Sequence, residues 1–167
     1  MKKIVKTFIL ISVTPLMFIH TGCKEVKELV PIPSMTATVD GESWTSLFRV
    51  SVLFESNDMI TITGTPDYTE NVDKAIILTI YGTDAGTYNL NPGTLSTNCS
   101  VVYRKTANAT EGTTDYYISK TATVTISSID KTNKRISGTF SATLINNSST
   151  EISITSGKFE NLNYQVQ

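Results

Sequence analysis

Short stretches in which apolar and polar residues alternate are the feature that most constrains the fold of this chain. In "TATVTISSI", Ala122, Val124 and Ile126 occupy every second position, and residues spaced in this way lie on one face of a β-strand. No window of helical length shows an apolar period of about 3.6 residues, and Thr, Ser, Val, Ile and Tyr prevail throughout. The sequence therefore predicts an all-β protein.

Turn residues separate these stretches at a spacing of roughly 8–12 residues, which is typical of β-sandwiches and barrels. Asp40-Gly41 lies between two short extended runs and is a strong hairpin signal. About nine or ten strands can be placed in this way. We therefore predict a single domain built as an antiparallel β-sandwich or as an open, lipocalin-like barrel.

Three details of the predicted strands can be checked individually. The run "KAIILTIYG" has apolar residues on both faces, Ile77 included, and predicts a central strand covered on both sides. Residues 106–115, "TANATEGTTD", have no periodic apolar residue and predict the longest loop. Gly138 interrupts a strand pattern, which indicates a bulge or a close approach of another backbone segment.

Residues 1–22 have the pattern of a secretory signal peptide. Lys2, Lys3 and Lys6 precede an apolar run over residues 7–19, and a basic start followed by a short apolar run is typical of such leaders. A membrane-spanning helix needs about 20 apolar residues, and this run is shorter. We expect a cleaved leader rather than a retained membrane anchor.

The end of the leader, "HTGC", resembles the bacterial lipobox, in which a small residue precedes a cysteine that is acylated and becomes the first residue. Thr21 and Gly22 fit that pattern, whereas His20 stands where an apolar residue is usual. Acyl chains on Cys23 would anchor the protein, because each buried methylene contributes about 0.8 kcal/mol. The alternative is a plain secreted protein cut near Gly22, with Cys23 a simple thiol.

Cleavage before Cys23 would divide the chain into a leader of residues 1–22, a tether of residues 23–34 and a β-domain of residues 35–167. The tether is charged and contains two prolines, which favour an extended spacer. The predicted location is the cell envelope, as an outer-membrane lipoprotein held to the membrane by its acyl chains. The sequence leaves open whether the domain faces the periplasm or the cell surface.

Loss of the leader removes His20, the only histidine of the chain. A mature chain without histidine excludes Ser-His-Asp and Cys-His catalysis and lacks the commonest transition-metal ligand. The leader also holds three of the 14 basic residues and none of the 15 acidic ones, so the mature chain is mildly acidic. This balance argues against nucleic acid as a partner, and we expect no metal, no cofactor and no enzymatic activity.

Paired carboxylates are the remaining route to catalysis, since glycosidases use two acids at a set distance. The candidates are Asp40 with Glu42, Asp67 with Glu70 and Asp73, and Asp115. All lie in predicted turns or loops, where acids are common, and the spacing in "PDYTENVD" does not match an EF-hand calcium loop. We therefore assign no catalytic role to them.

Cys99 has no disulfide partner if Cys23 is acylated. It lies in "TNCSVVY", which predicts the start of a strand, and free cysteines are among the most buried residues. A buried apolar role is therefore favoured over a reactive thiol. If Cys23 carried no lipid, a disulfide between the two cysteines would become possible in this oxidising compartment.

Aromatic residues near strand ends are the candidates for ligand binding, because Tyr and Trp are enriched at binding surfaces. Trp44 follows the first turn, and Tyr116 and Tyr117 are adjacent. Neighbouring strand residues point to opposite faces, so one tyrosine of this pair is expected to be exposed. The alternative for all three rings is packing in the core with the polar tip reaching water.

Several motifs together resemble a family of small lipoproteins of Bacteroidetes that is known only as a domain of unknown function. These motifs are the lipobox, "TATVDGESW", "GTYNL", "KRISGTFSATL" and the closing "ITSGKFENLNY". The resemblance covers the whole mature domain and implies an envelope lipoprotein with a β-rich fold. It implies no activity and no catalytic residues.

These observations predict a lipid-anchored envelope protein that acts as a non-catalytic binding or accessory module for a glycan, a peptide or a partner protein. One alternative is a lipocalin-like carrier, which needs an internal apolar cavity of roughly 300 Å³ or more. A more distant alternative is a carboxylate-based hydrolase of glycans, which needs two acids facing one cleft.

Overall fold

The computed structural model describes residues 32–54, 58–66, 73–92, 98–108 and 113–167 of the protein. These residues form ten β-strands, and none of them belongs to a helix that could span a membrane. The strands are β1 (Ser34–Val39), β2 (Glu42–Thr45), β3 (Phe48–Phe54), β4 (Met59–Thr65), β5 (Ala75–Tyr81), β6 (Gly86–Leu90), β7 (Cys99–Asn108), β8 (Thr113–Asp130), β9 (Arg135–Ile145) and β10 (Glu151–Val166). The prediction of an all-β fold is confirmed.

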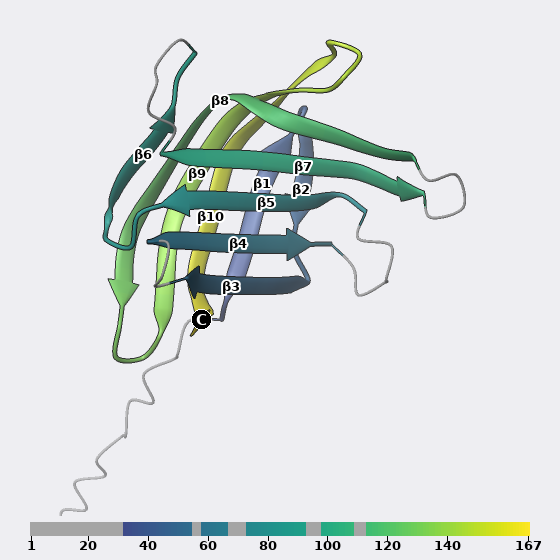
Figure 1. Cartoon of the computed structure of the whole chain (residues 1–167). Coiled ribbons are helices and arrows are strands. Elements are labelled where there is room, and N and C mark those ends of the chain that lie inside the picture. Colours follow the sequence, from purple (N-terminus) through teal and green to yellow (C-terminus); the bar gives the residue numbers. More distant parts are fainter. Residues whose placement is uncertain (1–31, 55–57, 67–72, 93–97, 109–112) are drawn as a thin grey trace, which may run out of the picture.

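All ten strands belong to one sheet that curls into a half-barrel (Figure 1). Hydrogen bonds connect the strands in the order β2-β1-β10-β3-β4-β5-β7-β8-β6, and β9 lies between β8 and β10. The described neighbours are antiparallel except β3 and β10, which pair in parallel between residues 51–53 and 164–166. Because β10 pairs with both β9 and β3, the strand pairings run from β10 through β3, β4, β5, β7, β8 and β9 back to β10. The structure therefore agrees with the barrel form of the prediction and not with a sandwich of two sheets.

Two long strands, β8 and β10, connect β9 to the group formed by β3, β4, β5 and β7. The first part of β8 pairs with β7, and its later part pairs with β6 on the same edge. Register shifts interrupt β8 beside β9 and β10 beside β9, and Ser156 and Asn161 of β10 have positive φ angles of 52° and 51°. Such β-bulges bend a strand and increase its twist. They account for the way in which β3, β4, β5 and β7 run across the direction of β9 and β10 in Figure 1.

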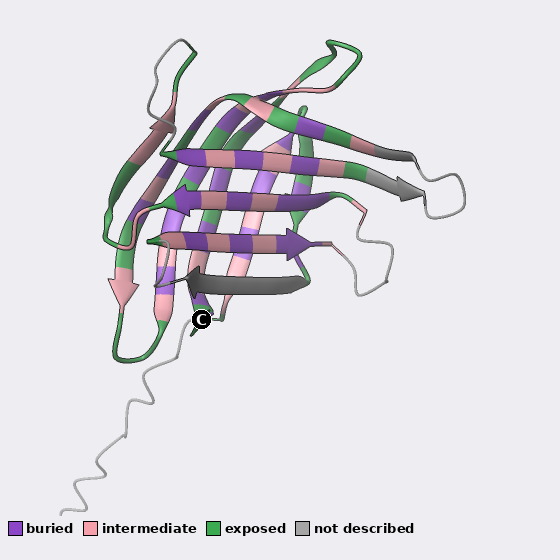
Figure 2. Ribbon diagram, in the orientation of Figure 1, coloured by how far each residue is buried: buried purple, intermediate pink, exposed green. Residues whose placement is uncertain are grey.

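The core lies inside the curl, and Figure 2 shows buried and less buried residues alternating along the strands. The inward faces predicted from alternation are confirmed on β4, β5, β8 and β9. Alternation in the sequence predicts these faces for Ile60 and Ile62 of β4, for Ile76, Leu78 and Ile80 of β5, for Ala122, Val124 and Ile126 of β8, and for Ile136, Phe140 and Leu144 of β9, and all of these residues are buried. Ile77, on the opposite face of β5, is half-buried, so the outer face of this strand is covered only in part.

The predicted loop at residues 106–115 is wrong for most of its length. β7 continues to Asn108 and β8 begins at Thr113, and residues 106–108 pair with residues 113–115. Thr and Asn are common in turns, but Thr also favours strands. The hydrogen bonds gained by continuing the β7–β8 pairing into residues 106–108 and 113–115 outweigh the local preference of this segment for a turn.

Two glycines allow strands β9 and β10 to pack closely under phenylalanine rings. Gly138 lies directly opposite Phe159, and Gly157 lies directly opposite Phe140. A Cβ atom on Gly138 would overlap the Phe159 ring and the carbonyl oxygen of Thr125, and one on Gly157 would overlap the Phe140 ring. The close approach predicted at Gly138 is confirmed, and a bulge of β8 lies beside it.

We predict that Gly138→Ala destabilises the fold. The added methyl group has no room beside Thr125 and Phe159, and urea unfolding should show a free energy of unfolding lower by about 1–3 kcal/mol. Gly86→Ala is the matched control, because the nearest atom to its Cβ would lie 3.9 Å away. Equal stability of the Gly138→Ala variant and the wild type would contradict the packing argument.

Cys99 begins β7 inside the core and has no exposed surface. Its thiol can donate to the carbonyl oxygen of Tyr88, at 3.3 Å, or to that of Ala122, at 3.9 Å. Burial raises the pKa of the thiol, and hydrogen bonds from backbone groups oppose that rise. Cys23 lies outside the described residues, so a disulfide with it stays an untested alternative.

The buried thiol predicts a loss of stability at alkaline pH. An acid whose pKa is raised in the folded state keeps its proton where the unfolded chain has lost it, so stability falls as pH rises above the ordinary thiol value of 9.0. Urea unfolding measured from about pH 7.5 to 10 should therefore weaken more steeply for the wild type than for Cys99→Ala. Parallel pH profiles of the two proteins would show that the thiol makes no such contribution.

Candidate functional site

The β1–β2 hairpin positions Trp44 at the edge of the core. Asp40 and Gly41 have positive φ angles of 50° and 86°, the conformation of a two-residue type I′ turn, and the predicted hairpin is confirmed. The Trp44 side chain is buried, and its Nε1–H donates to the carbonyl oxygen of Lys74 at 2.6 Å. The backbone N–H of Asp40 donates to the carbonyl oxygen of Ser153 at 2.8 Å, which ties the turn to β10.

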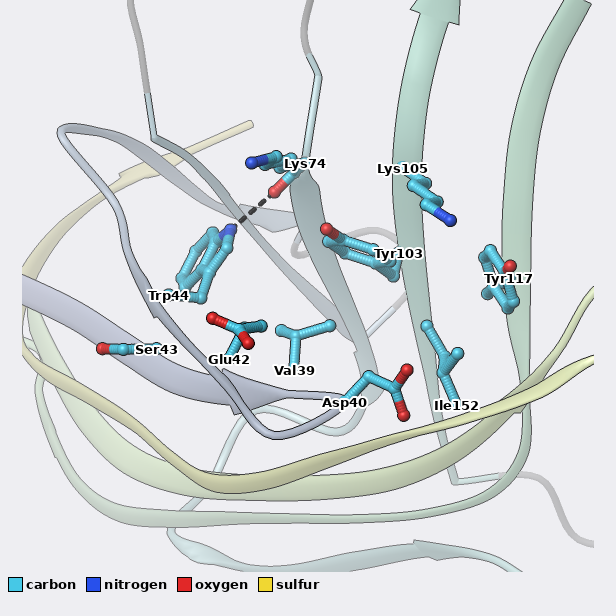
Figure 3. A pocket seen from close by; sticks show the side chains of 10 residues that line it. All are labelled: Val39, Asp40, Glu42, Ser43, Trp44, Lys74, Tyr103, Lys105, Tyr117 and Ile152. Carbon is cyan, nitrogen blue, oxygen red and sulfur yellow. Dashed lines mark hydrogen bonds between the residues drawn. The ribbon is translucent and has the colours of Figure 1, made fainter.

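A pocket of about 250 Å³ opens beside this hairpin (Figure 3). Its walls come from the hairpin, from the residue before β5, and from β7, β8 and β10. The residues that line this aromatic pocket are Val39, Asp40, Glu42, Ser43, Trp44, Lys74, Tyr103, Lys105, Tyr117 and Ile152. Segments from five parts of the chain therefore meet at one site.

Tyr103 of β7 and Tyr117 of β8 lie directly opposite each other in the two strands. Their ring centroids are 6.4 Å apart, and the ring planes differ by 47°. Only 7% and 4% of their surfaces are exposed, and neither hydroxyl has a hydrogen-bond partner within the described part of the chain, but both hydroxyl oxygens remain accessible to water. Burial raises the pKa of the Tyr103 hydroxyl, and nearby Tyr117 raises it further. Tyr103 is therefore a neutral group that can donate to or accept from a ligand.

Charged residues surround the aromatic walls of the pocket. Asp40 and Glu42 come from the hairpin, and Lys74 and Lys105 come from the opposite side (Figure 3). All four side chains belong to exposed residues, and the two signs balance. The pocket therefore combines an aromatic interior with a charged rim that favours neither anions nor cations.

The structure separates the three aromatic residues predicted from the sequence. Trp44 and Tyr117 line the same pocket. Tyr116 lies on the outer face of β8 with 41% of its surface exposed, and the Arg104 guanidinium lies 5.4 Å from the centre of its ring. The prediction that the two adjacent tyrosines face opposite ways is confirmed.

Sequence reasoning missed Tyr103, Lys74 and Lys105 as members of the site. Tyr103 meets Tyr117 only in the register of the β7–β8 hairpin. The predicted loop at residues 106–115 hid that register, because it removed the pairs that set it. Counting back from the hairpin would pair residues 106–108 correctly but would place Tyr103 opposite Ile118, because the register shifts by one residue between Arg104 and Thr106. The position of the hairpin alone would therefore not have brought the two tyrosines together.

Among the acidic residues considered for catalysis that the structure describes, one pair shares the pocket. Asp67 and Glu70 lie outside the described residues, and Asp73 and Asp115 do not line the pocket. Asp40 and Glu42 do line it together. Within the described ranges, no three His, Cys, Asp or Glu side chains are placed to hold a metal ion.

Comparison with known proteins bears on the β-domain alone. No curated protein and no solved structure matches the chain. A family model described as a domain of unknown function, DUF6252, matches residues 32–163, which cover all ten strands apart from the last residues of β10. The chain belongs to this DUF6252 family.

Proposed function

We propose that this protein is a lipid-anchored component of the cell envelope and a non-catalytic binding module. Its aromatic pocket would hold an apolar side chain of a peptide or of a partner protein. The observation that carries the proposal is the pair of hydroxyls of Tyr103 and Tyr117, which belong to buried rings but have no partner in the described chain. Neither hydroxyl oxygen is fully buried, so both can bond to water in the pocket, and a peptide amide at this position would take the place of that water.

A peptide fits the pocket better than a stacked sugar does. Trp44, Tyr103 and Tyr117 expose 4–7% of their surfaces, so none of them offers a flat ring on which a sugar could lie. The pocket of about 250 Å³ that they line is small enough to suit a single apolar side chain. The charged rim can pair with polar neighbours of that side chain, whichever sign they carry.

The same dimensions support a carrier of a small apolar ligand less well. The pocket volume of about 250 Å³ is below the roughly 300–1,000 Å³ of sites that enclose drug-sized ligands. Core residues such as Leu78, Val101 and Val124 have no exposed surface, so no void that admits a water molecule touches them. The interior around these residues is filled by side chains.

A carboxylate hydrolase has one observation in its favour, because Asp40 and Glu42 line the same pocket. Both residues are exposed, so neither carboxyl group lies in the apolar surroundings that generate a general acid. Both belong to a tight turn, where acids are common for structural reasons. We therefore propose binding without catalysis.

The anchor and the location rest on the sequence. The basic start, the short apolar run and "HTGC" support a lipobox, and residues 23–34 support a tether. The family match begins at residue 32, which supports a division between tether and β-domain close to the predicted one. Membership of a group of Bacteroidetes lipoproteins and attachment to the outer membrane belong to the same proposal.

Binding in the pocket can be measured through Trp44, the only tryptophan of the chain. We predict that N-acetyl-leucinamide or N-acetyl-phenylalaninamide changes its emission in a saturable way when the full chain is held in lipid nanodiscs. N-acetylglycinamide should have no effect, because it lacks an apolar side chain. The double variant Tyr103→Phe, Tyr117→Phe should bind about tenfold more weakly, since it loses two hydrogen bonds.

Tyr116→Phe is the matched control, because Tyr116 lies on the outer face of the sheet, and its affinity should equal that of the wild type. The absence of a saturable change with both apolar amides would refute the peptide proposal. A saturable change with N-acetylglucosamine alone would do the same and would favour a glycan in the pocket.

Lipidation predicts a defined N-terminus. Mass spectrometry of the protein purified from bacterial envelopes should find Cys23 as the first residue, with acyl chains attached. A free amine on any other residue would contradict the lipobox assignment and favour a plain secreted protein.

A further inference from the structure

The outer face of β8, β9 and β10 carries hydroxyl groups where an exposed sheet commonly carries charges. On β8, every outward position from Thr121 to Ser127 is Thr or Ser, and on β9 the same is true from Ser137 to Thr143. We call these outward residues, together with the outward residues 153 and 155 of β10, the hydroxyl face. They alternate with core residues, so the strand period directs all of them to the same side.

Strand pairing arranges these hydroxyls in rows. Thr121 lies opposite Thr143, which lies opposite Ser153, and Thr123 lies opposite Ser141. Neighbouring strands are about 4.7–4.9 Å apart, and positions on one face repeat at about 6.6–6.8 Å along a strand. Because Thr and Ser side chains are short, they have little conformational freedom to lose on binding. The rows therefore form a preorganised array of donors and acceptors.

A hollow of about 210 Å³ lies in the hydroxyl face. Six hydroxyl residues and Asn91 line it, and none of the described residues around it is ionisable. Charged residues are close in sequence to the residues that line the hollow, and they form ion pairs: Lys120 contacts Glu151 at 2.6 Å, and Lys158 contacts Glu160 at 2.7 Å. Charged side chains therefore occur near the hollow, but none of them lines it.

The chemistry of the hollow selects its ligand. A charged ligand would lose hydration without gaining an opposite charge, and an apolar ligand would leave hydroxyls such as those of Thr121 and Thr143 without partners. Thr123 already donates to Oδ1 of Asn89 at 2.9 Å. A neutral molecule rich in hydroxyl groups exchanges its hydrogen bonds with water for equivalent bonds to the protein. The rows extend across three strands, which suits a chain of such units better than one small molecule.

We infer that the hydroxyl face binds a neutral polysaccharide, whose chain lies across β8, β9 and β10 with its hydroxyl groups in the hollow. The site shares no residue with the aromatic pocket, so it stands or falls independently of the proposed peptide site. Recognition here uses hydrogen bonds and needs no exposed aromatic ring.

Affinity electrophoresis of the full chain tests this inference, with dextran, mannan or hydroxyethyl cellulose in the gel. At least one of these neutral polymers should retard the wild type. The triple variant Thr121→Val, Thr143→Val, Thr155→Val keeps the shape of the side chains but removes three hydroxyls that line the hollow. We expect it to bind the retarding polymer at least about tenfold more weakly.

The variant Thr61→Val, Thr63→Val, Thr79→Val is the matched control, since these three threonines are half-buried on the outer face of β4 and β5. It should be retarded like the wild type, and thermal unfolding should show both triple variants folded. Failure of all three neutral polymers to retard the wild type would overturn the inference. Equal loss in the control, or retardation by polygalacturonate alone, would overturn it as well.

Discussion

The reciprocal packing of Phe159 over Gly138 and of Phe140 over Gly157 fixes how β9 and β10 pair, and the rest of the half-barrel depends on that pairing. The two rings lie 6.4 Å apart and fill the space that the glycines leave. A slip of one residue would move every side chain of a strand to the other face. It would turn the hydroxyl rows inward and the core residues outward, so one packing interaction maintains both surfaces of the sheet.

Alternation along single strands allowed the inward faces of β4, β5, β8 and β9 to be predicted, because burial on one side imposes a period of two. The bends could not be predicted in the same way. Ser156 and Asn161 adopt positive φ within β10. Asn adopts this conformation more readily than most residues, but Asn163 of the same strand does not adopt it, and Ser156 gives no such signal. Curvature depends on bulges whose position is decided by the neighbouring strand, and that information is not local.

The candidate site was harder to predict than the fold. Trp44 and Tyr117 could be named because aromatic residues are few, but their meeting with Tyr103 depends on register and on the length of the β7–β8 hairpin. The hydroxyl face has the opposite character. Each threonine on it looks like an ordinary strand residue, and the array appears only when β8, β9 and β10 are placed side by side. Sites that are formed by the pairing of several strands cannot be predicted from the sequence of each strand taken separately.

The parallel contact between β3 and β10 has a consequence for the order of folding. Ser51 finds its partner Tyr164 only after every intervening strand has been synthesised. Contacts between residues so distant in sequence form late and slow the search for the native topology. Until β10 arrives, β3 presents an unpaired edge of the kind that recruits other chains. A newly made chain therefore passes through a stage in which this edge of β3 is open to pairing with another chain.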